Sequence, residues 1–208
     1  MAGDHPALFI AKIMLVSIIL YPLGVLCHEV VGHGLTGIVF GGRINRVEVL
    51  GFDVYPHVHW RGWMHRYGEC DVTGVESAVG GNMVALSGSL STWLVSIGAM
   101  ARMWLSKRGR KSLILAALGL WWVDMFTYTL PSWGIPRSIL WGQRDFSEPY
   151  SGAVGLGMPG WMFQALVIIT SAALALAWVG LVVAGSRRIP LRPDASPEHR
   201  VPEPSPRR

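Results

Sequence analysis

Residues 28–33 read His28-Glu29-Val30-Val31-Gly32-His33 and directly follow an apolar run from Ala7 to Cys27. The two histidines stand five positions apart, whereas two side chains on one face of a regular helix stand four apart. At about 100° per residue, five positions turn the imidazoles about 140° away from each other. One wider turn of the π type would return them to one face, and Gly32 and Gly34 allow such a turn. The sequence therefore predicts a local irregularity in this helix.

The composition of the chain is that of a membrane protein. Of its 208 residues 51% are hydrophobic and only 15% are charged, and there are ten Trp, which is too apolar for an ordinary soluble domain. Four stretches are long enough to cross about 30 Å of hydrocarbon, at residues 7–27, 79–105, 112–131 and 160–185. The first lacks the basic start of a cleavable signal peptide, so we expect it to remain as a span. The predicted fold is an all-α polytopic membrane protein with about four transmembrane helices.

The distribution of Lys and Arg predicts the orientation of these spans. Segments 41–79 and 132–159 balance basic against acidic residues, which is typical of the outer side. Between the second and third spans, and again in the tail, basic residues gather: Arg102, Lys107, Arg108, Arg110, Lys111, Arg187, Arg188, Arg192, Arg200, Arg207 and Arg208. We therefore expect an integral protein of a bacterial-type plasma membrane, with both termini cytoplasmic and residues 28–33 in the outer half.

The net charge of +5 follows from this topology and from contact with anionic membrane lipid, and no nucleic-acid-binding motif accompanies it. We expect residues 1–185 to form one membrane-embedded domain. The tail at 186–208 is rich in Pro and Arg, cannot build a core, and is expected to be disordered.

Histidine and glutamate side chains at the end of a membrane helix are costly, and so they are candidates for function. Two imidazoles from one helix are typical ligands of Zn²⁺, and a catalytic zinc takes three protein ligands and leaves one position open. His28 and His33 would then bind the metal, and Glu29 would act as the general base. The competing interpretation is structural: Glu29 and His33 are four apart and can pair on one helix face.

The hexapeptide His28-Glu29-Val30-Val31-Gly32-His33 resembles the expanded motif of the dipeptidyl-peptidase III family, in which both histidines bind zinc. In its apolar setting it also resembles the membrane metalloproteases of the site-2 protease type (peptidase family M50, including its smaller M50B-like members), whose motif is one residue shorter. The second resemblance covers more of the chain and implies a peptide-bond hydrolase in the bilayer. In many proteins of that type the zinc lies nearer the cytoplasmic face, opposite to the orientation predicted from charge.

Two aspartates compete for the third ligand position. Asp124 lies within the third span, where an unpaired carboxylate is expensive. The third ligand of site-2-type proteases is an Asp that follows a Pro, and Pro131 and Asp145 are similar in their order, although Phe146 replaces the Gly of that pattern. The resemblance thus favours Asp145, and burial cost favours Asp124. For either residue, pairing with Arg or helix capping is the alternative.

The outer segment 41–79 alternates polar and apolar residues and predicts a short β-like interfacial element after the first span. His57 and His59 would share one side of it, as an accessory metal site or as interfacial side chains. Site-2-type proteases have a comparable element beside the active site, and an exposed edge there would hold an unwound substrate as an added strand.

Three further positions have two interpretations each. Asn82 at the start of the second span would polarise a scissile carbonyl or serve helix packing. Cys27 would be a soft ligand, a partner of Cys70 in a disulfide, or a small buried hydrophobe. Ser87-Gly88-Ser89 lacks the frame of an intramembrane serine nucleophile, so we exclude a serine protease.

Together these patterns predict a membrane-embedded, zinc-dependent endopeptidase that cleaves a membrane-protein or peptide substrate within or next to the bilayer. Its predicted site comprises Glu29 as base, with His28, His33 and Asp145 or Asp124 around Zn²⁺. The alternative is a non-enzymatic membrane metal-binding protein or metal transporter that uses the same groups.

Overall fold

The computed structural model describes residues 6–62, 67–106, 112–136 and 146–186. It is mostly helical, with 72% of residues in helices, and it has a small antiparallel sheet after the first helix. Four helices are long and apolar enough to cross a membrane: Ala7–Val39, Ala78–Leu105, Leu113–Trp133 and Gly160–Gly185. The predicted number and positions of the spans are confirmed, whereas the predicted disordered tail lies outside the described residues.

The first span contains the irregularity that the histidine spacing predicts. It begins as the α-helix α1 (Pro6–Leu26), widens into the π-helix η1 (Cys27–Gly34), and returns to α-geometry in α2 (Leu35–Val39). The widened part covers the whole hexapeptide. The prediction of a π-type turn is therefore confirmed.

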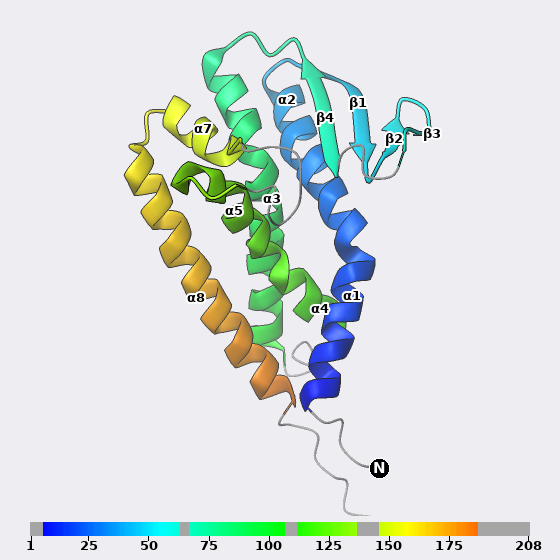
Figure 1. The fold of residues 1–208 in the computed structure, drawn as a ribbon, viewed down its shortest axis with the longest axis vertical. Coiled ribbons are helices and arrows are strands. Elements are labelled where there is room, and N and C mark those ends of the chain that lie inside the picture. Colours follow the sequence, from blue (N-terminus) through cyan, green and yellow to red (C-terminus); the bar gives the residue numbers. More distant parts are fainter. Residues whose placement is uncertain (1–5, 63–66, 107–111, 137–145, 187–208) are drawn as a thin grey trace, which may run out of the picture.

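The predicted β-like segment is a four-stranded antiparallel sheet. Its strands are β1 (Arg43–Val49), β2 (Phe52–Tyr55), β3 (His59–Trp60) and β4 (Gly68–Thr73), in the order β3-β2-β1-β4. β4 is an edge strand and packs against η1. The sheet lies beside the end of the first span that carries η1 and α2 (Figure 1).

The second span is α3 (Ala78–Leu105), and Ser77 caps its N-terminus with a hydroxyl that accepts a hydrogen bond from the Gly80 N–H. The third span is broken into short pieces. They are α4 (Leu113–Leu118), the 3₁₀ turn η3 (Gly119–Trp121), α5 (Trp122–Thr129) and the 3₁₀ turn η4 (Leu130–Trp133). Ser96 of α3 donates a hydrogen bond to the carbonyl of Gly119 at 2.6 Å, which satisfies a backbone group at the break.

A short helix, α7 (Glu148–Gly155), precedes the last span, α8 (Gly160–Ser186). Gly152 and Gly155 let α7 approach α3 closely. A Cβ at Gly155 would collide with the side chain of Asn82, and a Cβ at Gly152 would collide with the backbone carbonyl oxygen of Asn82. This contact sets the position of the first residue of α7, Glu148. It also supports the packing interpretation of Asn82.

α3 runs through the middle of the molecule, with α1 and α8 on either side (Figure 1). The first residues of α1 and the last residues of α3 and α8 lie at one end, and the sheet and α7 lie at the other. Many apolar side chains of α1 and α8 are exposed, among them Ile18, Ile19 and Leu176. An apolar helix with an uncovered face is typical of contact with lipid.

Candidate metal centre

The π-helix is held by hydroxyl groups of α3. Ser87 donates a hydrogen bond to the carbonyl of Gly32 at 2.9 Å, and Ser91 donates one to the carbonyl of Cys27 at 3.2 Å. The two helices cross at two glycines, since a Cβ at Gly32 would lie 2.5 Å from the Cα of Gly88. The hydroxyls of Ser87 and Ser91 and the close approach at Gly88 therefore support the widened backbone of η1.

The widened turn brings His28 and His33 together. Both side chains are buried, and their ring centroids lie 4.9 Å apart. The Nδ1 of His33 donates a hydrogen bond to the carbonyl of Val84 at 2.6 Å, and the Nδ1 of His28 donates one to the Oδ2 of Asp124 at 2.8 Å. With a proton on each Nδ1, each Nε2 presents a lone pair, as a metal-binding histidine requires.

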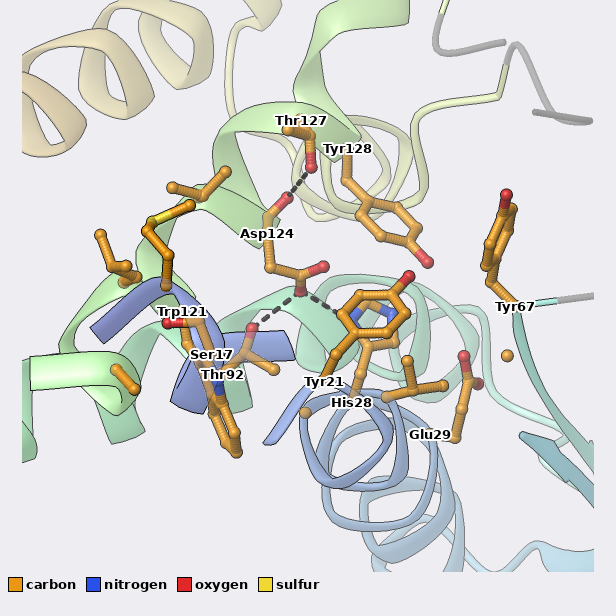
Figure 2. Close-up of a pocket in the computed structure, with 17 residues that line it drawn as sticks. Ser17, Tyr21, His28, Glu29, Tyr67, Thr92, Trp121, Asp124, Thr127 and Tyr128 are labelled. Atoms are coloured by element: carbon orange, nitrogen blue, oxygen red, sulfur yellow. Dashed lines mark hydrogen bonds and ion pairs between the residues drawn. The ribbon is translucent and has the colours of Figure 1, made fainter. Parts of the chain in front are cut away.

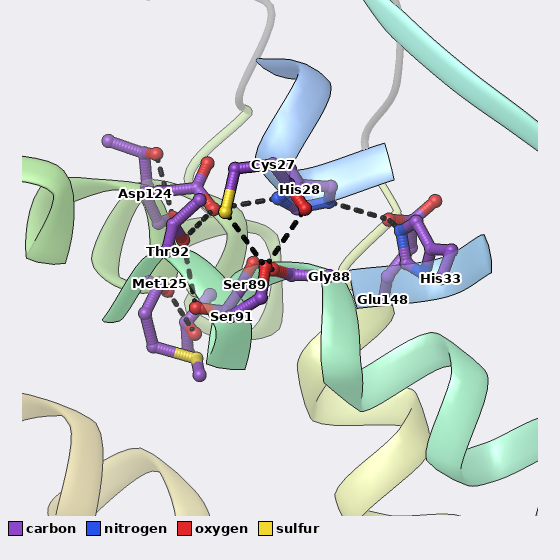
Figure 3. A network of polar contacts seen from close by, with 12 residues as sticks. Cys27, His28, His33, Gly88, Ser89, Ser91, Thr92, Asp124, Met125 and Glu148 are labelled. Atoms are coloured by element: carbon purple, nitrogen blue, oxygen red, sulfur yellow. Dashed lines mark hydrogen bonds and ion pairs between the residues drawn. The ribbon is translucent and has the colours of Figure 1, made fainter. Parts of the chain in front are cut away.

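Both Nε2 atoms face the carboxylate of Glu148 (Figure 3). Its Oε2 lies 3.4 Å from the Nε2 of His33 and 3.9 Å from the Nε2 of His28. Burial alone would raise the pKa of Glu148, but hydrogen bonds and positive charge from His28 and His33 in their protonated forms outweigh that effect and hold its pKa below the usual range. Glu148 is therefore a carboxylate at neutral pH, the form that binds a cation. A bound cation would replace the protons on the two Nε2 atoms.

The three groups fit a metal ion. Their ligand atoms all lie within 4.8 Å of one another. Ligands about 2.0–2.1 Å from a tetrahedral zinc are separated by about 3.4 Å, the distance between the Nε2 of His33 and the Oε2 of Glu148, whereas the Nε2 of His28, 3.9 Å from that oxygen, would have to move closer. In addition, the Nε2 of His28 is buried and has no hydrogen-bond partner among the described residues. A buried polar atom without a partner is costly, and a cation would satisfy it.

Asp124, one of the two aspartates predicted as third ligand, lies on the other side of His28. Its Oδ2 accepts hydrogen bonds from the Nδ1 of His28 and, at 2.8 Å, from the hydroxyl of Thr92. The ring of Tyr128 stacks on the imidazole with centroids 4.7 Å apart. Asp124 thus fixes the ring orientation and tautomer of His28, and Glu148 occupies the position expected for the third ligand. Asp145, the other aspartate, lies outside the described residues.

Replacement of Asp124 by Asn is expected to weaken metal binding, measured with Zn²⁺, about 10- to 100-fold, because a neutral amide oxygen is a weaker acceptor than a carboxylate for the Nδ1–H that fixes the tautomer of His28. Competition with a metal-binding dye measures this change, and Glu76→Gln, at an exposed carboxylate away from the three groups, is the control. Unchanged zinc affinity in Asp124→Asn would contradict the positioning role.

Glu29, the predicted base, is buried beside these groups. β4 makes room for its carboxylate at Gly68, because a Cβ there would collide with the Oε1 of Glu29. Glu29 and His28 line one end of the same pocket (Figure 2). His33 forms its ion pair with Glu148. This contact does not favour the competing interpretation, in which His33 pairs with Glu29 on one face of the helix.

Other candidate positions lie apart from these groups. His59 begins β3 and His57 precedes it, and neither belongs to the one group of three or more ligand side chains found among the described residues. Cys27 contacts the hydroxyl of Ser91, and both Cys27 and Cys70 are free thiols.

Cys70 lies on β4, and burial, then the negative charges of Glu29 and Asp71, raise its pKa to about 12. The thiol form therefore dominates at pH 8, and the thiolate is the form that reacts. We expect iodoacetamide to alkylate Cys70 at least about tenfold more slowly at pH 8 than after unfolding in denaturant. Equal rates, measured by mass spectrometry of the peptide that contains Cys70, would show that β4 does not pack against η1 as described.

Glu148 was not among the residues predicted from the sequence. The available signal was local: Ser147-Glu148-Pro149 begins a helix whose Gly152 and Gly155 form a small-residue face. Such a face indicates close packing against another helix, but it does not identify that helix.

Comparisons with known proteins found no matching family model, no matching curated protein and no matching solved structure.

Proposed function

We propose that the chain is a membrane-embedded, zinc-dependent endopeptidase similar to the site-2 protease type, which cleaves a peptide bond within or next to the bilayer. One observation carries this proposal: two imidazole Nε2 atoms and the carboxylate of Glu148 converge beside a buried second carboxylate, that of Glu29. Three protein ligands leave one coordination position for chemistry, whereas a structural zinc site usually has four.

Each residue of the site has a separate role. His28, His33 and Glu148 would hold the ion, and a bound Zn²⁺ supplies Lewis acidity toward water and a carbonyl oxygen. Glu29 accepts the proton of the attacking water and returns it to the leaving amine. Asp124 and the carbonyl of Val84 hold the two imidazoles in the tautomer that binds a cation.

The membrane placement follows from charge and from the arrangement of the helices. The ends of α3 and α8 lie together with the start of α1, and α3 carries Arg102 in its last turn. We assign this end to the cytoplasm of a bacterial-type plasma membrane, which puts the candidate metal centre, the sheet and α7 toward the outer side.

The test uses the full chain, purified and placed in lipid nanodiscs. We expect about one zinc per chain, cleavage of an added transmembrane peptide, loss of both after chelation, and recovery of both on addition of Zn²⁺. Zinc binding without cleavage of any peptide, together with zinc uptake into vesicles that survives Glu29→Gln, would replace the peptidase with a metal transporter. Absence of stoichiometric metal would contradict both the peptidase and the metal transporter.

A further inference from the structure

A pocket of about 390 Å³ begins at His28 and Glu29 and extends along the first span (Figure 2). His28 and Glu29 lie at one end, and Met14 and Ser17 of α1 line the pocket farther along the helix. At 1.5 Å per residue, Met14 lies about 18 Å from Leu26, the last residue of α1, and Glu29 follows in η1. The opposite wall comes from α4, η3 and α5, including Leu120 and Trp121. The pocket therefore runs from the groups proposed for catalysis to the depth of the apolar spans.

The pocket opens sideways. Met14 and Tyr21 line it and are 52% and 37% exposed, so the pocket is open at these two residues of the first span. A surface of this apolar helix faces hydrocarbon when the protein is in a bilayer. An occupant would therefore enter from the membrane, which favours apolar groups.

The walls favour a polypeptide over a lipid chain. They are mainly apolar, but they also carry hydroxyl groups from Ser17, Tyr21, Thr127 and Tyr128. An acyl chain has no hydrogen-bonding group along its length, whereas each residue of an extended peptide has an N–H and a C=O that must be satisfied away from water. Ser17 and Thr127 donate to the carbonyls of Ile13 and Asp124, so their oxygens remain as acceptors for a peptide N–H.

The volume limits the size of the occupant. A cavity of about 150 Å³ holds one benzene ring, so this pocket has room for about two ring-sized side chains. A whole transmembrane helix, about 10 Å across, does not fit.

Resting on the proposed peptidase function, we propose that this pocket binds the apolar side chains of about two substrate residues that lie on the bilayer side of the scissile bond. The substrate class is then a membrane polypeptide cleaved near the end of its apolar segment, with large apolar residues next to the cleavage point. The pocket supplies selectivity, and Glu29 and the metal ligands supply the chemistry.

The test compares two neighbouring substitutions on α1. Ser17→Phe fills the pocket, whereas Ile18→Phe adds the same ring on the exposed side of the helix. The substrates are two transmembrane peptides that carry Leu or Ala at the two positions on the bilayer side of the cleavage point. We expect Ser17→Phe to lower the ratio of kcat/KM for the Leu peptide to that for the Ala peptide about tenfold. Zinc content stays unchanged, and Ile18→Phe keeps the wild-type ratio.

A second measurement does not depend on cleavage. In the Glu29→Gln protein, a peptide with a benzophenone side chain at the same position should crosslink to residues that line the pocket, and Ser17→Phe should prevent it. Crosslinks elsewhere, or an unchanged Leu-to-Ala ratio in Ser17→Phe, would overturn the pocket assignment even if peptides are cleaved. Pocket crosslinks without any cleavage by the zinc-loaded wild type would instead refute the peptidase and leave the peptide-binding pocket standing.

Discussion

Replacement of Glu29 by Gln is expected to lower peptide cleavage about 10²- to 10⁴-fold while about one zinc per chain remains bound. Gln has nearly the same shape as Glu and fits the space that Gly68 leaves on β4, so η1 should keep its geometry. It cannot accept the proton of the attacking water. Cleavage of a fluorogenic transmembrane peptide and elemental analysis of the same preparation measure the two quantities side by side.

The control for this variant is Glu76→Gln, at an exposed carboxylate before α3. It makes the same chemical change and should alter neither quantity. If Glu29→Gln lost its zinc together with its activity, Glu29 would be a ligand and not the base. If it kept full activity, the proposed chemistry would be wrong.

Replacement of Gly88 by Ala should disrupt the candidate metal centre, although Gly88 is not one of the three ligands. A Cβ at this position would lie 2.5 Å from the Nε2 of both His28 and His33, closer than carbon and nitrogen atoms can approach. The imidazoles must move, and a displacement of about 1 Å in a catalytic site costs about 10²-fold in rate. We expect at least that loss in cleavage, together with loss of tightly bound zinc and about 1–3 kcal/mol of stability.

Gly98→Ala on the same helix is the matched control, because a Cβ there meets open space. It should keep zinc and activity and should stabilise the helix by up to about 1 kcal/mol. Thermal unfolding monitored by circular dichroism separates local disruption of the site from failure to fold. A folded Gly88→Ala protein with normal zinc binding would contradict the described crossing of α3 and η1.

The helix irregularity was predictable because the spacing of the two histidines indicates it directly. His28 and His33 are five apart, and Gly32 and Gly34 are adjacent to the second histidine, so a metal-binding interpretation requires a wider turn, which η1 provides. The four spans were predictable for the same reason, since length and apolar character are local properties. The 3₁₀ turn at Gly119 was not predicted, because it depends on contacts such as the hydrogen bond from Ser96.

The third ligand position was harder to predict, because it depends on tertiary packing. The expectation that a carboxylate in the third span needs a partner is confirmed for Asp124, but its partners are Thr92 and the Nδ1 of His28. Glu148 reaches the site because Gly152 and Gly155 bring α7 against α3. Its distance in sequence from the hexapeptide carries no information about this contact.

X-ray absorption spectroscopy of the zinc-loaded protein tests the central claim most directly. The described geometry predicts a first shell of nitrogen and oxygen atoms at about 2.0–2.1 Å, with the outer-shell scattering of two imidazoles. In His33→Ala the scattering of one imidazole should be lost, which would identify His33, in the widened turn, as the second ligand. A shell with a single imidazole in the wild type, or with sulfur at about 2.3 Å, would contradict the convergence of His28, His33 and Glu148 on one ion.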